Sequence, residues 1–548
     1  MRRRFLVLSL LLAPLAGCDS STPKFWQPSN DLLPMVALGD RVAFVERNSQ
    51  TAFLLDPADP AFKPRQVPVG KAPVAAVKHN GSNQMLVLSH GETGSASVQA
   101  IPAQLQVIDA NTASLASATY PLAGRYDSLA QSVEGRFVLL YHSSSTQNAS
   151  DTGLFNPNEL TIVDFAPPAH PAGPTLTTKS IRSLGGVPTR IEFSPPYAFQ
   201  AGARSLAVVL SQNYVTIQDL NNADRTEISV PLCPQSTGCT YSPDQILFDP
   251  ANANIYVRAG NAKDIFQIAL TDLGAAAPGG SNDFLASLSM LSVGANPASM
   301  ALYGSGPSTR LAVLAPASKS LVIIDPKTSH TLSIATSIQA NIIVPFTVLD
   351  QSSIAKNQAM LVDTLNGSTS VLFADLEQVE TTGGLSIKDA PLRAAVGDVR
   401  PLVDQGIAVL VLGKYGSISA FTVVEFGITS KFVDIAASGT FANPYFEMRN
   451  PSRLWGVDSG TGLGYLNLVA HSSEATLVHN LVWLDQTITS IQALDQASSD
   501  GHRYLVVGQS DPNGIGNLTF LDADHPDRAT ARTAYGFLFS NYLERVQP

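Results

Sequence analysis

The chain has 548 residues, of which 45% are hydrophobic and 14% charged, and its formal net charge is −10. An acidic chain whose lysines and arginines form no cluster beyond the first residues is poorly suited to the phosphate backbone, so we expect no binding of nucleic acid. Low charge beside high apolar content is typical of an extensive β-core with uncharged polar groups on the surface.

The first residues predict an export signal. Arg2, Arg3 and Arg4 precede an apolar run, Phe5 to Leu12, which is far shorter than the roughly 20 residues that a membrane-spanning helix needs. The segment Leu15-Ala16-Gly17-Cys18 resembles the lipobox of bacterial lipoproteins. That resemblance implies cleavage after residue 17 and a lipid on Cys18, and an ordinary secretory signal is the alternative.

Both interpretations predict an exported protein, and the lipoprotein interpretation predicts a membrane anchor facing the periplasm or the cell surface. Loss of the three arginines lowers the formal charge from −10 to about −13. We assign residues 1–17 to the signal peptide, 18–33 to a polar, proline-bearing tether, and 34–548 to one folded region.

An acidic residue closes a short apolar run about every 52 positions, a period typical of propeller repeats. The runs end at Asp56, Asp109, Asp164, Asp219, Asp325, Asp375, Glu425 and Asp522. An aspartate at a strand end accepts hydrogen bonds from the backbone N–H groups that follow, so we interpret these acids as turn formers and not as calcium ligands.

A second apolar strand precedes each acidic strand and gives ten unit starts, two of them in units whose acidic position has drifted. These strands begin at Arg41, Met85, Phe137, Leu206, Ile255, Leu311, Met360, Ile407, Leu454 and Tyr504. With a strand ahead of each, often opened by proline, and a more polar strand behind, the unit has four strands, which we name A to D.

This unit resembles the YVTN/WD40-like propeller repeats of bacterial surface and periplasmic proteins, as in Pro188 to Pro195 (PTRIEFSP) followed by a Val-Ile-Asp-like strand. We therefore predict an all-β fold, a β-propeller of four-stranded blades with about ten units in one large ring. Two smaller propellers in series, or an overcount of weak units, are the alternatives. Closure needs no strand borrowed from the N-terminus, and we expect the segment from Thr533 to pack across the first blade.

Besides Cys18 the chain holds two cysteines, Cys233 and Cys239. In an oxidising compartment such a close pair favours a local disulfide, and no histidine lies nearby to suggest a metal site.

The longest insertions predict an interaction face. Segments 90–104, 142–158 and 508–517 follow B strands, and the cysteine loop follows a D strand, so all four lie on one face of a propeller. The candidate interaction-face residues are His90, His142, Asn156, Asp511 and Asn513. Loops carry function more often than scaffold strands do. Because His90 and His142 end B strands of neighbouring units, they could approach a common rim.

Catalytic motifs for serine hydrolases, zinc helices and phosphate-binding loops do not occur. The sequence favours a lipid-anchored, non-enzymatic scaffold or assembly factor that binds an envelope or extracellular protein, without catalytic residues, metal, nucleotide or other cofactor. The alternative is a lactonase- or glycan-acting hydrolase whose site lies at the ring axis, where strands A offer Lys78, Arg190, Glu192, Glu447 and Arg449.

Overall fold

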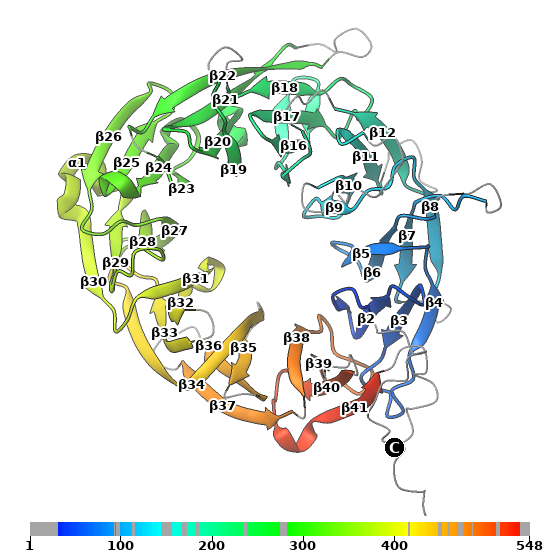
Figure 1. Ribbon diagram of the computed structural model, residues 1–548. Helices are drawn as coiled ribbons and strands as arrows, with labels where there is room; N and C mark the ends of the chain where they lie inside the picture. Colours follow the sequence, from blue (N-terminus) through cyan, green and yellow to red (C-terminus); the bar gives the residue numbers. More distant parts are fainter. Residues whose placement is uncertain are drawn as a thin grey trace, which may run out of the picture.

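A computed structural model shows ten four-stranded antiparallel blades arranged in one ring (Figure 1). It describes residues 31–537 except 93, 95–98, 112–114, 144–155, 167–172, 182–185, 234–237, 275–281, 295, 415–416, 448–451, 459–460, 469–474, 485 and 511–515. The predicted fold class and the single ring are confirmed. Each blade places strand A nearest the axis and strand D at the rim.

Blades 1 to 5 occupy the first half of the chain. Their strands are β1 (Val36–Leu38), β2 (Arg41–Glu46), β3 (Thr51–Leu55) and β4 (Arg65–Pro68); β5 (Pro73–Lys78), β6 (Gln84–Ser89), β7 (Gln104–Asp109) and β8 (Ser117–Pro121); β9 (Ser128–Gln131), β10 (Phe137–Tyr141), β11 (Glu159–Asp164) and β12 (Thr175–Ser180); β13 (Arg190–Phe193), β16 (Leu206–Ser211), β17 (Tyr214–Asp219) and β18 (Ile228–Pro231); and β19 (Ser242–Asp249), β20 (Asn254–Gly260), β21 (Asp264–Asp272) and β22 (Phe284–Ser292).

Blades 6 to 10 complete the ring. Their strands are β23 (Ser299–Tyr303), β24 (Arg310–Ala315), β25 (Ser320–Asp325) and β26 (His330–Ala335); β27 (Ile342–Leu349), β28 (Ala355–Val362), β29 (Ser370–Asp375) and β30 (Ile387–Pro391); β31 (Val396–Leu402), β32 (Ile407–Lys414), β33 (Ser417–Glu425) and β34 (Lys431–Glu447); β35 (Ser452–Asp458), β36 (Gly462–Leu468) and β37 (Thr476–Trp483); and β38 (Thr487–Ala493), β39 (Tyr504–Ser510), β40 (Gly516–Asp522) and β41 (Arg532–Phe537).

Two elements add to the blade pattern. A hairpin of β14 (Tyr197–Phe199) and β15 (Gly202–Arg204) is inserted between β13 and β16, and helix α1 (Leu376–Thr382) follows β29. Asp375 caps α1 by accepting hydrogen bonds from the backbone N–H groups of Glu377 and Gln378, which have no partner within the helix. The described helices are all too short or too polar to cross a membrane.

Hydrophobic side chains pack between blades, one cluster at each of the ten boundaries. Strand β2 shows why its sequence is an unbroken apolar run. Val42 and Phe44 pack toward blade 10, whereas Ala43 and Val45 pack toward blade 2. A strand buried on both faces needs apolar residues at every position, unlike the alternating strand of a half-exposed sheet.

The ring closes by packing blade 10 against blade 1, and each contributes its own four strands, as predicted. Of the segment from Thr533, which was expected to pack across the first blade, residues 533–537 belong instead to β41 (Arg532–Phe537), the outermost strand of blade 10, and the remainder lies outside the described residues. Contact with blade 1 comes instead from Arg532, which donates to the carbonyls of Pro57 and Asp59 at 2.9 and 3.1 Å.

Blades 8 and 9 share one strand. The first part of β34 pairs with β33 as strand D of blade 8, and its last part, from Phe441 to Glu447, pairs with β35 as strand A of blade 9. The two blades are therefore joined into a seven-stranded sheet.

The recurring aspartates make the predicted turns. In seven of the eight acidic runs the Asp Oδ1 accepts the backbone N–H two residues further on, at 2.8 to 3.2 Å. The residues are Asp56, Asp109, Asp164, Asp219, Asp325, Asp375 and Asp522. The same local hydrogen bond thus ends strand C in seven blades.

Candidate interaction face

Strand direction alternates within every blade, so the connections after strands B and D share one face, which we call the B–C/D–A face. Its longest B–C connections are residues 90–103 in blade 2 and 142–158 in blade 3. In blade 10 the predicted long insertion is shorter, because Gly508–Ser510 continue β39 and Gly516–Asn517 begin β40. Blade 7 has a longer B–C connection, residues 363–369, which the sequence did not single out.

The structure brings His90 and His142 to one residue, Tyr126, in the connection from blade 2 to blade 3. His90 Nε2 lies 3.0 Å from the Tyr126 carbonyl oxygen, and the His142 ring packs against the Tyr126 ring with centroids 5.1 Å apart. Tyr126 is fully buried; its hydroxyl donates to Glu159 Oε1 at 3.0 Å and accepts from Thr161 Oγ1 at 2.8 Å. The bases of both long loops therefore contact the same residue, His90 through the Tyr126 backbone and His142 through its ring.

Burial and nearby charges have opposing effects on the pKa of His142, which packs against Tyr126. Burial lowers the pKa of His142, while Asp127 and Glu159 act to raise it and His90 acts to lower it further. Asp127 also accepts the backbone N–H of Ser143 at 2.8 Å. With the ring 4% exposed and neutral, His142 serves as a packing group at the foot of its loop.

Asn156 lies at the other end of the blade 3 loop. Its Oδ1 accepts the backbone N–H of Asn158 at 3.1 Å, and its Nδ2 donates to Ser180 Oγ in β12 at 2.7 Å. The side chain is exposed and fixes the return of the loop into β11. Cys18, Asp511 and Asn513 lie outside the described residues.

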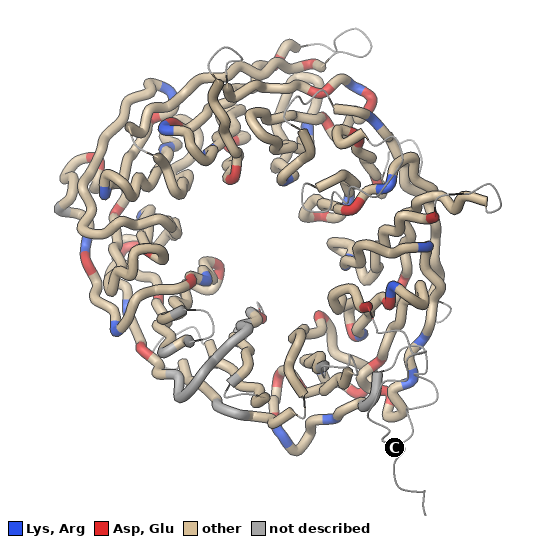
Figure 2. The backbone as a smooth tube through the Cα atoms, in the orientation of Figure 1, with Lys and Arg blue, Asp and Glu red and all other residues tan. Residues whose placement is uncertain are grey.

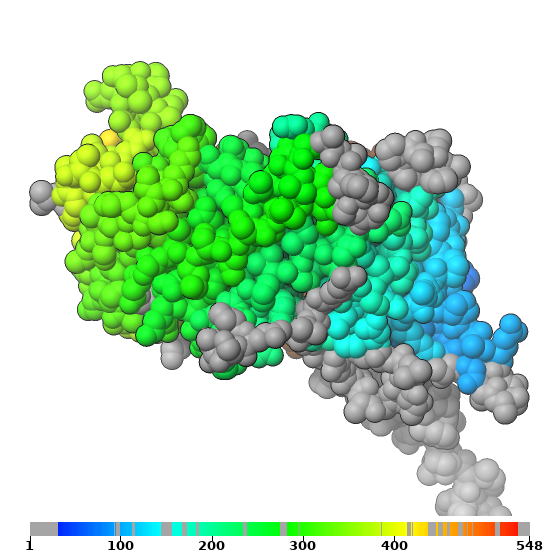
Figure 3. Space-filling model, turned by 90° about the horizontal axis from the view of Figure 1, so that it is seen from above, coloured from blue at the N-terminus to red at the C-terminus, as the bar shows by residue number. Residues whose placement is uncertain are grey.

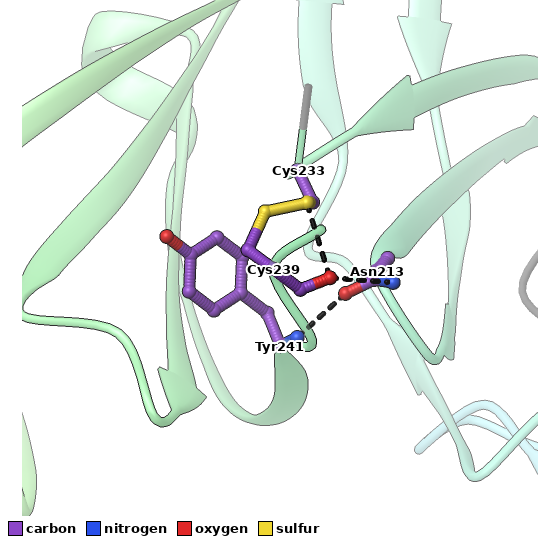
Figure 4. The surroundings of a disulfide bond; sticks show 4 residues. All are labelled: Asn213, Cys233, Cys239 and Tyr241. Atoms are coloured by element: carbon purple, nitrogen blue, oxygen red, sulfur yellow. Dashed lines mark hydrogen bonds between the residues drawn. A yellow bond between two sulfur atoms is a disulfide. The ribbon is translucent and has the colours of Figure 1, made fainter. Parts of the chain in front are cut away.

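The predicted disulfide is confirmed: Cys233 and Cys239 are bonded, with their Cα atoms 5.9 Å apart (Figure 4). Asn213 hydrogen-bonds residues on both sides of the cysteine loop. It lies in the tight turn between β16 and β17, and its φ of 64° is left-handed. Its Oδ1 accepts the N–H of Tyr241 at 2.5 Å and its backbone N–H donates to the Tyr241 carbonyl at 2.9 Å. A further bond of 2.8 Å, from the N–H of Leu232 to the Asn213 carbonyl, holds the near end of the cysteine loop.

Asn213 was not predicted from the sequence. The available signal was asparagine in a two-residue connection between apolar strands, because asparagine tolerates left-handed φ better than most residues do. The B–C turn of blade 4 and the D–A loop to blade 5 are thereby locked together on the predicted face.

The charged residues that were predicted at the ring axis and lie in the described part of the chain are held in separate ion pairs. Lys78 of blade 2 forms an ion pair with Asp495 of blade 10, and Arg190 pairs with Glu192 within β13 of blade 4. Glu447 is 3% exposed and bound by Arg503 and by Trp455 Nε1, the latter at 2.9 Å. Arg449 lies outside the described residues. Figure 2 shows acids and bases dispersed around the ring.

No grouping of three or more histidine, cysteine or acidic side chains suited to a metal ion occurs in the described part of the chain. One group of buried charges spans a blade boundary. Arg204 and Arg225 of blade 4 both reach Asp283 of blade 5, at 2.7 and 2.9 Å, and Asp283 is fully buried.

These observations define the class of protein: the chain is a ten-bladed β-propeller. On its B–C/D–A face, the first residues of the two longest B–C connections, His90 and His142, both contact Tyr126. No protein-family model matches the sequence, and no curated protein matches it either.

Similarity to solved structures is confined to the general architecture. A dihydro-heme d1 dehydrogenase, NirN, is 10% identical with a TM-score of 0.35, over 93% of this chain and 79% of that one. A eukaryotic initiation factor is 11% identical with a TM-score of 0.44, over 91% and 97%. AztD of Citrobacter koseri is 10% identical with a TM-score of 0.31, over 67% and 87%. At these values the similarity assigns neither a ligand nor a family to this chain.

Proposed function

We propose that this protein is an exported, lipid-anchored binding propeller of the bacterial cell envelope, whose partner is another envelope or extracellular protein. The partner docks on the B–C/D–A face over blades 2 to 4. The observation that carries this proposal is the anchoring of both long loops at Tyr126, by His90 in blade 2 and by His142 in blade 3.

Anchored loop bases favour binding because a loop whose ends are fixed loses less conformational entropy when it meets a partner. The disulfide and Asn213 restrain the neighbouring loop in the same way. Rigid strands that carry long loops are a common arrangement for recognition surfaces. The membrane anchor is proposed from Leu15 to Cys18 of the sequence alone.

A hydrolase with its site at the ring axis is the second function considered. Such a site needs acids, bases or nucleophiles that converge on one point. The described candidates belong to blades 2, 4 and 9 and are held in ion pairs. The binding function is therefore the one that the geometry supports better.

The test places a photo-crosslinking amino acid at Asn156 in the full-length protein, expressed in its own envelope. The matched control is Val133, which lies in the same blade on the opposite face and is 89% exposed. We expect discrete adducts with an envelope protein from position 156 and none from 133. Adducts of equal yield at both positions, or at 133 alone, would show that the proposed face is wrong.

A further inference from the structure

The outermost strand of blade 5, β22, differs from the other nine strands at the rim. Each of those nine contains a charged residue, a histidine or a proline: Arg65 in β4, Pro121 in β8, Lys179 in β12, Pro231 in β18, His330 in β26, Lys388 in β30, Lys431 in β34, His479 in β37 and Arg532 in β41. Such residues discourage a free strand edge from pairing with another strand. Strand β22, Phe-Leu-Ala-Ser-Leu-Ser-Met-Leu-Ser, contains none of them.

This edge is also exposed and apolar. Leu285, Leu288 and Met290 are 56%, 37% and 61% exposed. Among the strands that the structure describes, none lies beyond β22 in its sheet. Figure 3 looks onto this part of the rim, which lies at the top of Figure 1, and Figure 2 shows β22 uncharged along its length.

The register identifies the backbone groups that face outward. The N–H of Leu273 donates to the Asp283 carbonyl at 2.8 Å, and the pairing continues in step from Asp272 with Phe284 to Asp264 with Ser292. In an antiparallel pair, alternate residues exchange hydrogen bonds with the neighbouring strand. The odd-numbered residues of β22 therefore bond to β21, and the even-numbered residues from 284 to 292 point their N–H and C=O groups away from the blade.

We propose that β22 is a self-association edge, on which a second copy of this chain pairs antiparallel about Leu288. A two-fold interface requires a self-complementary surface. Pairing about Leu288 sets every outward-facing residue opposite another outward-facing residue, so the free backbone groups of the two edges meet.

The side chains match in the same register. Leu288 meets Leu288 at the two-fold axis, and the remaining pairs are Ala286 with Met290, Leu285 with Leu291, Ser287 with Ser289, and Phe284 with Ser292. Apolar residues thus face apolar residues and serine faces serine, except in the end pair. Because the strand is uncharged, two copies approach without repulsion between like charges.

The experiment measures self-association of the full-length protein in detergent by sedimentation velocity, over about 1 to 100 µM. We expect a monomer–dimer equilibrium that Leu288→Lys and Met290→Lys each weaken by at least about tenfold. Leu288→Lys places two like charges opposite each other at the two-fold axis, and Met290→Lys replaces the apolar partner of Ala286 by a charged one. The control is Leu349→Lys, a matched change at a leucine that is 65% exposed at the end of β27 in blade 7.

A second measurement fixes the register. Leu288→Cys should give a covalent dimer under mild oxidation or with a short bis-maleimide, whereas Leu349→Cys should not. Thermal unfolding of each variant checks that the blades remain folded. A chain that stays monomeric throughout the range overturns the proposal. A dimer that survives both lysine substitutions, or equal cross-linking at 288 and 349, overturns it as well.

Discussion

Gln245 of blade 5 binds both backbone groups of Met300 in blade 6: its Nε2 donates to the Met300 carbonyl at 2.9 Å, and its Oε1 accepts the Met300 N–H at 3.1 Å. Gln131 of blade 3 makes a similar double contact with blade 2, donating to the Lys78 carbonyl at 2.8 Å and accepting the Asn80 N–H at 3.1 Å. In each contact the side-chain amide of a glutamine makes one donated and one accepted hydrogen bond with the backbone of the neighbouring blade, as a paired strand would. We call each double contact a latch, and both glutamines lie in innermost strands.

Replacing Gln245 by leucine should destabilise the ring by about 1–3 kcal/mol, because the N–H and C=O of Met300 lose their partner in a part-buried position. The midpoint of thermal unfolding measures the effect. Gln378→Leu, on the exposed surface of α1, is the matched control and should change the midpoint little. Equal midpoints for the two variants would mean that the latch contributes nothing to stability.

Removal of the disulfide, by Cys233→Ser with Cys239→Ser, should leave the blades folded and cost about 2 kcal/mol, as expected for closing so short a loop. Limited proteolysis should detect faster cleavage between residues 233 and 239. Asn213→Ala should have a similar effect with the disulfide intact, because alanine disfavours the φ of 64° and loses the bond to Tyr241. Unchanged cleavage in both variants would contradict the conclusion that the disulfide and Asn213 restrain this loop.

The lowered pKa of Asp283 predicts that the folded protein loses stability in acid. Burial alone would raise the pKa of Asp283, but hydrogen bonds from Arg204 and Arg225 outweigh it, so the folded-state pKa lies below the ordinary value. A lowered folded pKa contributes stability above the unfolded pKa of about 3.9, and that contribution is lost as the pH falls through the folded value. Thermal midpoints should therefore separate wild type from Asp283→Asn at pH 7 and converge toward pH 3. A constant separation across that range would refute the assignment.

His142 predicts a second pH dependence, confined to the foot of the blade 3 loop. Burial lowers its pKa, so the neutral ring is favoured in the folded state, against the opposing charges of Asp127 and Glu159. Its contribution is complete above the unfolded pKa of about 6.5 and is lost as the pH falls below that value toward the folded pKa. Amide hydrogen exchange at residues 142–143 should accelerate, after correction for intrinsic rates, between pH 7 and pH 5. In His142→Gln, which stays neutral, this acceleration should disappear; its persistence would place the titrating group elsewhere.

Local features of this protein were predictable because they repeat. Burial on both faces makes each strand B a continuous apolar run, so the ten runs from Arg41 to Tyr504 predicted ten blades. Asp109 and Asp325 form turns with residues two positions away, and Cys233 meets Cys239 within one loop. Each of these contacts depends on neighbours in the chain and on little else.

Loop lengths were predicted less well. Residues at both ends of the segment 508–517 continue β39 and β40, since pairing with a neighbouring strand can extend a strand through polar residues. The β14–β15 hairpin was also missed, because its support comes from blade 5, where Phe199 stacks on Phe284 with ring centroids 5.0 Å apart.

The sequence by itself determined the blade count, the acidic turns and the cysteine pairing, because near neighbours in the chain carry that information. Only the tertiary structure decided that His90 and His142 share Tyr126, that Gln245 latches Met300, and that no described strand pairs with the outer edge of β22. These relationships join residues tens of positions apart, or depend on which strand has no neighbour. They are set by strand register and by closure of the ring, which no local pattern of residues encodes.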